Sequence, residues 1–231
     1  MLSFDLDGYS LKWYNDFFSS LNWQQAVKNS IIIAIFSTLL STFFGTLAAL
    51  GLSRSYLPFR SVLMAILISP MIVPLIISAA AMFLFYSKWG LQGTYAGVIL
   101  AHAALGTPFV VITVTATLVG FDHSLVRAAH SLGASPTTTF FRIIVPLILP
   151  GVVSGALFAF ITSFDEVVVI KFVGSYKQHT IPWQMFSGIR EHISPTILAV
   201  ATILVTLSIM LLTTLELLRR RSERLRGASA Q

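Results

Sequence analysis

The chain has 231 residues, of which 55% are hydrophobic and 10% are charged, and its net charge is +6. Soluble domains average about 25% charged residues, so this chain has too little charge to cover itself with a solvated surface. The composition therefore predicts a polytopic membrane protein. Its lack of cysteine excludes disulfides, thiolate nucleophiles and cysteine-based metal sites. Nucleic-acid binding is also excluded, because the positive charge lies at the ends of apolar segments and not in one patch.

Long stretches without a charged residue predict the membrane spans. An α-helix needs about 20 residues to cross the hydrocarbon core, and a charge at the bilayer centre costs roughly 2.5–3.5 kcal/mol on insertion scales. Open strands are not expected, because they would leave backbone groups unpaired in lipid. We therefore expect an all-α transmembrane bundle of about five spans, near residues 30–52, 62–86, 95–119, 147–169 and 196–218.

Proline and glycine predict irregularities inside two of these spans. Pro70 and Pro74 lie in the second span and cannot donate a backbone hydrogen bond, so a kink or an unwound turn is expected there. Gly106, Thr107 and Pro108 predict a similar break in the third span.

The distribution of arginine predicts the orientation. Arginines flank the first loop, lie in the connector 121–146 and crowd the basic tail 219–231, which are all on one side if five spans alternate. Since cytoplasmic loops are enriched in Lys and Arg, we expect the N-terminus outside and the C-terminus in the cytoplasm.

Three further regions complete the predicted organisation. Residues 1–28 form an external N-terminal segment whose aromatic residues suit the membrane interface as a short amphipathic helix. Residues 29–218 form the transmembrane domain. Within it, residues 171–195 are too polar to span and are expected to form an external or re-entrant segment.

The connector 121–146 begins with a pattern typical of a short capped helix. Asp122 can accept hydrogen bonds from the first free N–H groups of a helix that runs to Leu132. Gly133 is placed to end that helix in a left-handed conformation. Ala128 and Ala129 favour helix and leave a thin face on which another protein can pack closely.

A second short helix is predicted directly after the first. Ser135 and Pro136 have the residue types preferred at an N-cap and at the first helical position. We expect this helix to carry Ile143 and to end where Pro146 turns the chain into the fourth span.

This spacing resembles the EAA loop of permease subunits of bacterial ABC importers, in which Glu-Ala-Ala is followed at fixed distances by Gly, Ile and Leu-Pro. The matching residues here are Ala128, Ala129, Gly133, Ile143, Val145 and Pro146, whereas Arg127 stands in place of the acid. In that family the loop forms a coupling helix in a groove of the ATP-hydrolysing subunit. The resemblance implies that coupling role for Arg127, Ala128, Ala129, Leu132, Gly133, Ala134, Ile143 and Pro146.

The resemblance also implies the fold and the partners. It implies a bundle of the type I ABC importer kind in the bacterial inner membrane, working with an ABC ATPase dimer, a second permease subunit and an external solute-binding protein. The chain contains no Gly-x-x-x-x-Gly-Lys-Ser/Thr phosphate loop. We therefore expect no cofactor in this chain, with ATP and Mg²⁺ bound by the partner ATPase.

From about Asn29 onward the chain looks most like the second permease subunits of spermidine/putrescine importers. The matching stretches are residues 163–169, 180–182, 193–195 and 199–202. Members of that group usually have six spans, and the first of these has no counterpart here. The resemblance implies transport of polyamines or related cationic amines. Relatives that carry opines, amino-acid derivatives or aminophosphonates give the alternative substrates.

Asp165 and Glu166 end the fourth predicted span, where ionisable groups are costly and often functional. A carboxylate beside the path would attract an ammonium group, and we favour Asp165 for that role, with Glu166, Ser163 and Thr107 as further path residues. The structural alternative is that Asp165 caps the next segment while Glu166 pairs with Lys171 or Arg190.

Two other functional classes compete with the importer. An intramembrane hydrolase would use Ser154 and His102, but the segment from Gly151 to Gly155 has one residue too many for Gly-x-Ser-Gly, and His102 is expected to be a buried side chain bonded to a neighbouring helix. A passive channel would not need the connector.

Overall fold

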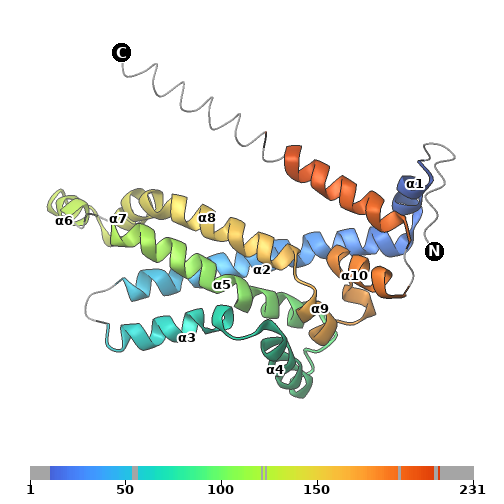
Figure 1. Ribbon diagram of the computed structural model, residues 1–231. Helices are drawn as coiled ribbons and strands as arrows, with labels where there is room; N and C mark the ends of the chain where they lie inside the picture. Colours follow the sequence, from blue (N-terminus) through green and yellow to red (C-terminus); the bar gives the residue numbers. More distant parts are fainter. Residues whose placement is uncertain are drawn as a thin grey trace, which may run out of the picture. The chain divides into compact units, whose positions relative to one another are not determined.

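The computed structural model describes residues 11–53, 57–120, 122, 124–191, 194–210 and 213, and every regular element among them is a helix. The all-helical fold confirms the predicted class. The chain divides into two compact units, Gln25–Gln184 and the combination of Met1–Gln24 with Met185–Gln231. The α-helices are α1 (Lys12–Ser19), α2 (Leu21–Leu52), α3 (Arg60–Ile72), α4 (Leu75–Lys88), α5 (Tyr95–Val119), α6 (Ser124–Ser131), α7 (Pro136–Thr139), α8 (Val145–Phe164), α9 (Val168–Val173) and α10 (Ile181–Glu191), with a π-helix η1 (Phe140–Ile144), a 3-10 helix η2 (Tyr176–Gln178) and an apolar helix Thr196–Met210 (Figure 1).

Three of these helices are long and apolar enough to cross a membrane, namely Leu21–Leu52, Tyr95–Val119 and Pro136–Phe164, and the bent pair of α3 and α4 makes a fourth if it counts as one span. They correspond to the first four predicted spans. The helix Thr196–Met210 is the described part of the fifth. The remainder of that span and the predicted basic tail 219–231 lie outside the described residues.

The second span is broken, as the two prolines predicted. α3 and α4 meet at an angle of 103°. Val73 between them is extended, with φ −70° and ψ 134°, which is the conformation that a following proline favours. Pro70 lies inside α3, whereas Pro74 precedes the first residue of α4. The break therefore comes from Pro74, and α4 turns away from the direction of α3 (Figure 1).

The third span does not break, so the prediction made from Gly106, Thr107 and Pro108 is wrong. α5 runs from Tyr95 to Val119 with Pro108 inside it. A Cβ atom on Gly106 would lie 2.6 Å from Oγ of Ser41 and 3.0 Å from Cβ of Ala159. The glycine is there because two neighbouring helices touch α5, and not because the helix must bend.

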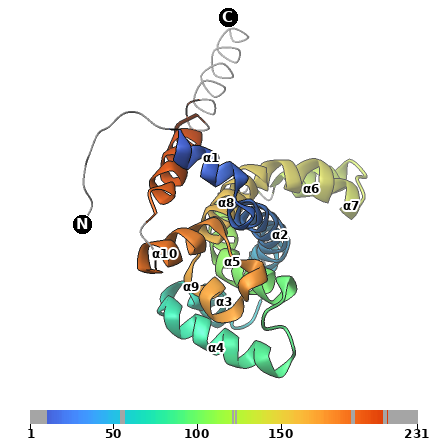
Figure 2. The same cartoon turned by 90° about the vertical axis from the view of Figure 1, so that its right-hand side faces the viewer.

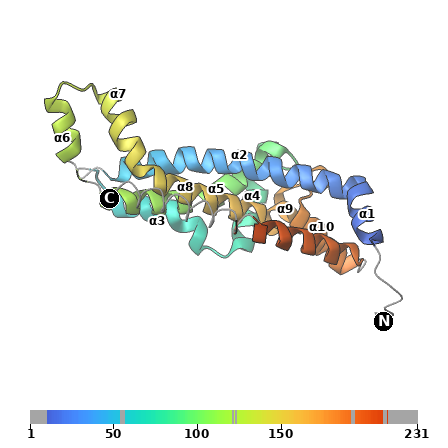
Figure 3. The same cartoon turned by 90° about the horizontal axis from the view of Figure 1, so that it is seen from above.

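The fourth span begins and ends at other residues than predicted. Residues Pro136–Phe164 form one uninterrupted run of helical residues, but Figures 2 and 3 show that α7 leaves the bundle in a different direction from α8, so the chain does turn between the connector and the span. The backbone N–H of Val145 reaches the carbonyl of Phe140, five residues back, and the helix then continues through Pro146. At the other end the run of helical residues stops at Phe164, whereas the predicted span continued to Val169.

Small residues hold α2, α5 and α8 together within the unit Gln25–Gln184. On α2 the packing face includes Ala34, Ser37, Ser41, Gly45 and Ala49, spaced three or four residues apart and all buried. Figure 2, which looks along the bundle, shows the three helices side by side.

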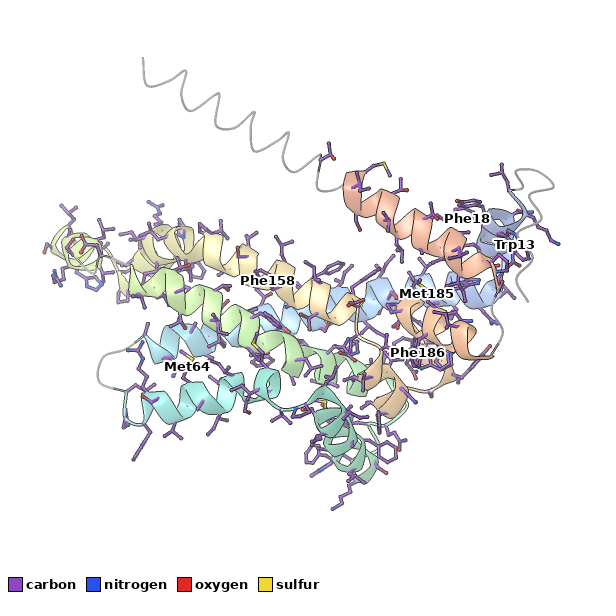
Figure 4. All side chains as sticks on the ribbon, in the orientation of Figure 1. Trp13, Phe18, Met64, Phe158, Met185 and Phe186 are labelled. Carbon is purple, nitrogen blue, oxygen red and sulfur yellow. The ribbon has the colours of Figure 1, made fainter. Side chains whose placement is uncertain are left out.

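Glycines set the closest approaches between these helices. A Cβ atom on Gly45 would lie 2.7 Å from Cβ of Val110 on α5, and a Cβ atom on Gly155 of α8 would lie 2.7 Å from Cα of Val110. The same two helices are also joined by an aromatic contact. Phe158 of α8, labelled in Figure 4, stacks on Phe109 of α5 with ring centroids 6.0 Å apart.

The other unit contains α1, which confirms the short helix expected near the N-terminus. Phe17 of α1 is buried and lies 5.7 Å from the ring of Trp23, whereas Phe18 is exposed (Figure 4). The carboxylate of Asp16 accepts a 2.6 Å hydrogen bond from the hydroxyl of Thr196, at the start of the helix Thr196–Met210. This helix start and α1 are therefore joined by a side-chain bond.

Candidate functional site

The connector begins with the capped helix that the sequence predicts. Asp122 Oδ1 accepts a 2.8 Å bond from the backbone N–H of Ser124, and Oδ2 accepts a 2.6 Å bond from the Ser124 hydroxyl. The backbone N–H of Leu125 reaches the carbonyl of Asp122 at 3.2 Å. These bonds satisfy donors at the start of α6 and confirm Asp122 as its cap. Figure 3 shows α6 projecting beyond the long helices at one end of its unit.

Gly133 ends α6 in the left-handed conformation, as predicted. Its φ is +81°, the N–H of Gly133 donates to the carbonyl of His130 at 3.0 Å, and the N–H of Ala134 donates to that of Ala129 at 3.0 Å. A bond that spans five residues beside a left-handed residue is typical of a Schellman cap. The turn between the two connector helices is therefore specified by one glycine.

The second connector helix begins where the sequence predicts. The Ser135 hydroxyl accepts a 3.2 Å bond from the backbone N–H of Thr138, and Pro136 is the first residue of α7. The backbone then stays helical through η1 into α8, although α7 and α8 run in different directions (Figure 3). Ile143 and Pro146, both expected to lie before the span, are therefore part of the same run of helical residues as the span itself.

Exposure differs sharply among the predicted coupling residues. Arg127 and Ala128 are exposed, and the side chain of Leu132 is 88% exposed. Ala129 is only 7% exposed. Both alanines were expected to be accessible to another protein, but only Ala128 is. Phe141, which was not among the predicted coupling residues, has an aromatic side chain that is 68% exposed on η1.

The acidic pair lies directly at the break after α8. Asp165 caps the C-terminus of α8 through its backbone and its side chain is exposed. Glu166 is buried, and its Oε1 accepts bonds from the backbone N–H groups of Val168 at 2.6 Å and Val169 at 2.9 Å. The alternative that Asp165 caps the next segment is therefore wrong, because Glu166 holds the start of α9.

Burial raises the pKa of the Glu166 carboxyl, and the backbone N–H bonds to it act in the opposite direction. The two acids therefore lie in different environments. The Glu166 carboxylate is bonded to the start of α9, whereas the Asp165 carboxylate is exposed next to the C-terminal end of α8.

Ser163 lies in a buried polar cluster that joins three helices. Its Oγ lies 2.8 Å from the hydroxyl of Ser37 on α2 and 2.9 Å from Nδ1 of His102 on α5. His102 is 1% exposed, which confirms the expected buried, helix-bridging histidine. Its Nε2 has no hydrogen-bond partner among the described residues. Since Ser154 is exposed on α8, His102 serves Ser163 and not the serine that the hydrolase alternative requires.

Thr107 is not part of this cluster. Its hydroxyl donates a 2.7 Å bond to the carbonyl of Ala103 in its own helix, and Ser41 of α2 donates to the same carbonyl at 2.9 Å. Of the predicted path residues, the structure therefore brings together Ser163, Asp165 and Glu166 at the end of α8 and places Thr107 further along α5.

A second polar cluster, missed by the sequence analysis, fixes the segment 174–181 to the start of the bundle. The amide of Asn29, fully buried on α2, donates to the carbonyls of Lys177 at 2.9 Å and His179 at 2.8 Å. The Tyr95 hydroxyl donates to Asn29 Oδ1 at 2.7 Å, and the Ser30 hydroxyl accepts from the N–H of Ile181 at 2.8 Å. We call Asn29, Ser30 and Tyr95 the polar clamp.

Beside the clamp, the His179 ring stacks on that of Trp183, with centroids 3.4 Å apart. Burial lowers the pKa of His179, so its neutral form is favoured in the folded chain. In the sequence, the polar clamp could have been noticed only from Asn29 and Tyr95, single polar residues at the starts of two apolar stretches. The segment is thus held by directed bonds and ring stacking.

We expect Asn29→Leu to release the segment 174–181 while leaving the transmembrane helices in place. The variant removes two bonds to carbonyls and a bond from Tyr95, each worth about 1 kcal/mol net, and it leaves buried acceptors unpaired. Amide hydrogen exchange across 174–181 should rise by at least about tenfold. Gln92→Leu, which makes the same chemical change at an exposed position, is the control. Equal exchange in both variants would show that the clamp does not hold the segment.

Residues 41–224 match the family model described as binding-protein-dependent transport system inner membrane component. The spermidine/putrescine transport system permease protein PotC of Haemophilus influenzae is 34% identical over 93% of this chain and 84% of its own length. The putrescine transport system permease protein PotI of Escherichia coli is 30% identical over 85% of this chain and 73% of its own length.

A solved structure has a similar fold. It is a bacterial ABC transporter involved in the import of the acidic polysaccharide alginate, with a TM-score of 0.62 and 18% identity over 76% of this chain. The match covers 61% of that chain, which is less than two thirds. At this identity the likeness concerns the arrangement of the helices alone.

Proposed function

This chain belongs to the family of binding-protein-dependent transport system inner membrane components, and we propose that it forms half of the substrate path of an ATP-driven importer. As a member of that family it is a membrane-embedded transport component and not an enzyme. Its partners in the proposed importer are a dimer of ATP-hydrolysing subunits, a second permease subunit and an external solute-binding protein. ATP and Mg²⁺ are held by the ATPase partner.

The observation that carries this proposal is the geometry of the connector. A capped helix, a left-handed Gly133 and a second capped helix project from one end of the unit, with Leu132 almost fully exposed (Figure 3). The second helix is continuous with α8. A soluble protein that binds α6 can therefore move a membrane-spanning helix directly, through Arg127, Ala128, Leu132, Gly133 and the residues that support them.

The proposed orientation places the connector in the cytoplasm of a bacterial cell, with the N-terminus outside. Arg127 and Arg142 in the connector and Arg60 at the start of α3 lie on the same side in this arrangement, which follows the enrichment of cationic residues in cytoplasmic loops. The polar clamp and the segment 174–181 then face the exterior, where a solute-binding protein delivers its cargo.

Polyamines or related cationic amines are the proposed substrates. Two similar proteins are named for spermidine and putrescine transport. The exposed Asp165 carboxylate at the end of α8 supplies the charge that an ammonium group requires. Opines, amino-acid derivatives and aminophosphonates are the alternative, since choice among them rests largely with the external binding protein.

The function is tested by reconstituting the chain with its second permease and ATPase in proteoliposomes. Spermidine uptake should require ATP inside the vesicles and binding protein outside. Uptake without ATP would identify a passive channel instead, and peptide cleavage by the chain alone would identify a hydrolase.

For the substrate path we expect Asp165→Asn to reduce spermidine uptake about tenfold, because one charge-assisted contact to an ammonium group is worth roughly 1.5–3 kcal/mol. ATP hydrolysis by the assembled transporter should change less than twofold. Asp165→Glu, which keeps the charge, should restore most of the uptake. Asp16→Asn is the control, because it removes an exposed carboxylate on α1 and its amide oxygen can still accept the bond from Thr196. Unchanged uptake in Asp165→Asn would leave Asp165 with a structural role only.

A further inference from the structure

The stretch that follows Asp122 and continues to the end of α8 carries positive charge and no acid. From His123 to Phe164 the sequence contains Arg127 and Arg142 and no Asp or Glu. The acid at the border of this stretch is Asp122, whose carboxylate accepts both bonds from Ser124 that cap α6. The surface offered by α6 is therefore cationic.

The exposed residues of α6 form a specific pattern. Arg127 and His130 are three residues apart on the helix, so they lie on neighbouring positions of one surface, and both are exposed. Ala128 beside them adds no bulk. Leu132 follows directly after α6 with 88% of its side chain exposed. The guanidinium of Arg127, the small side chain of Ala128 and the exposed apolar side chain of Leu132 thus lie within about two helical turns of one another. They are at the end of the unit far from the segment 174–181 (Figure 3).

We propose that the ATPase subunit that docks on this chain presents a carboxylate opposite Arg127 and an apolar pocket for Leu132. This inference rests on the proposed function and specifies the partner's chemistry. Burying an arginine at an interface without an acid is costly, whereas a carboxylate can take two parallel N–H bonds from the guanidinium. The EAA pattern has an acid at this position, which would suit a cationic groove. Arg127 therefore repels the ATPases that fit such permeases and selects one of opposite charge.

The test measures association of the ATPase with the membrane-embedded permease pair, using the ATPase that co-purifies with the wild-type chain and carries a phosphate-loop sequence. Arg127→Glu should weaken association by about tenfold or more, because it places like charges together in the interface. Arg127→Ala should weaken it less, and Arg127→Lys least. Arg60→Glu, the same charge change at an exposed site at the start of α3, should leave association within about twofold.

Salt separates a charge effect from a distortion of α6. The ratio of wild-type to Arg127→Glu affinity should fall when salt is raised from about 50 mM to about 500 mM, because the repulsion is screened. A ratio that does not change with salt, or tighter binding by Arg127→Glu, would overturn the inference.

A photoreactive residue at position 127 then identifies the facing residue of the ATPase. We expect Asp or Glu, and exchanging that acid for Arg should restore the affinity lost in Arg127→Glu. Contact with Lys or Arg would overturn the inference while leaving the importer function intact. If no ATPase associates with the wild-type chain at all, the proposed function itself fails.

Discussion

Gly133→Pro should abolish ATP-driven uptake while leaving the chain inserted in the membrane. Proline fixes φ near −65°, whereas Gly133 has φ +81° and donates its N–H to the carbonyl of His130. The substitution therefore redirects α6 relative to α7 and disrupts the surface on which we propose that the ATPase docks. Uptake into proteoliposomes and co-purification of the ATPase measure the effect, and both should drop by at least about a hundredfold, since the loss of a docked interface exceeds about 3 kcal/mol.

Two milder substitutions at the same position act as controls. A Cβ atom on Gly133 meets nothing within 4 Å, so any effect comes from the backbone and not from a collision. Gly133→Asn should retain most of the uptake, because asparagine tolerates left-handed φ, whereas Gly133→Val should lose it. Equal activity of the proline and asparagine variants would contradict a role for the left-handed turn.

Gly155→Val should prevent the helices of the bundle from packing. A Cβ atom at Gly155 would lie 2.5 Å from Oγ1 of Thr113 and 2.7 Å from Cα of Val110, so α8 must move away from α5. Overpacking of this kind typically costs 1–3 kcal/mol, and a collision with backbone lies at or above about 3 kcal/mol. The folded fraction in detergent, followed by gel filtration during heating, should fall sharply.

Alanine at two glycines gives a matched comparison for this prediction. Gly155→Ala should destabilise the chain, whereas Gly51→Ala should be neutral or stabilising by up to about 1 kcal/mol, because a Cβ atom at Gly51 meets nothing within 4 Å and alanine is the better helix former. Equal thermal stability of the two variants would show that close contact between α5 and α8 is dispensable.

Local patterns in the sequence predicted the features that local physics controls. Charge-free stretches identified the long apolar helices, because exclusion of charge from lipid acts on each residue separately. The break before α4, the cap at Asp122, the left-handed Gly133 and the N-cap at Ser135 were all predicted from the residue types that such positions favour.

The errors arose where a contact with a distant segment decided the outcome. Gly106 was expected to interrupt the helix, but its lack of a side chain instead allows Ser41 and Ala159 to pack closely against α5. The second connector helix was expected to end at Pro146, but a π-helix ahead of that proline keeps the backbone helical into α8. The cap that Glu166 provides for α9 was not predicted. The bonds of Asn29 join residues about 150 positions apart, which no local pattern contains.

The 29 helical residues from Pro136 to Phe164 extend over about 43 Å along the helix axis at 1.5 Å per residue. Their N-terminal part contains η1 with Pro136 and Pro146 on either side, whereas at Gly151 and Gly155 the helix packs against the backbone of α5. Contacts this short leave little room for α8 to slide along α5. We therefore expect the two helices to shift as one body when α6 is displaced, so that His102 and Asp165 change position together.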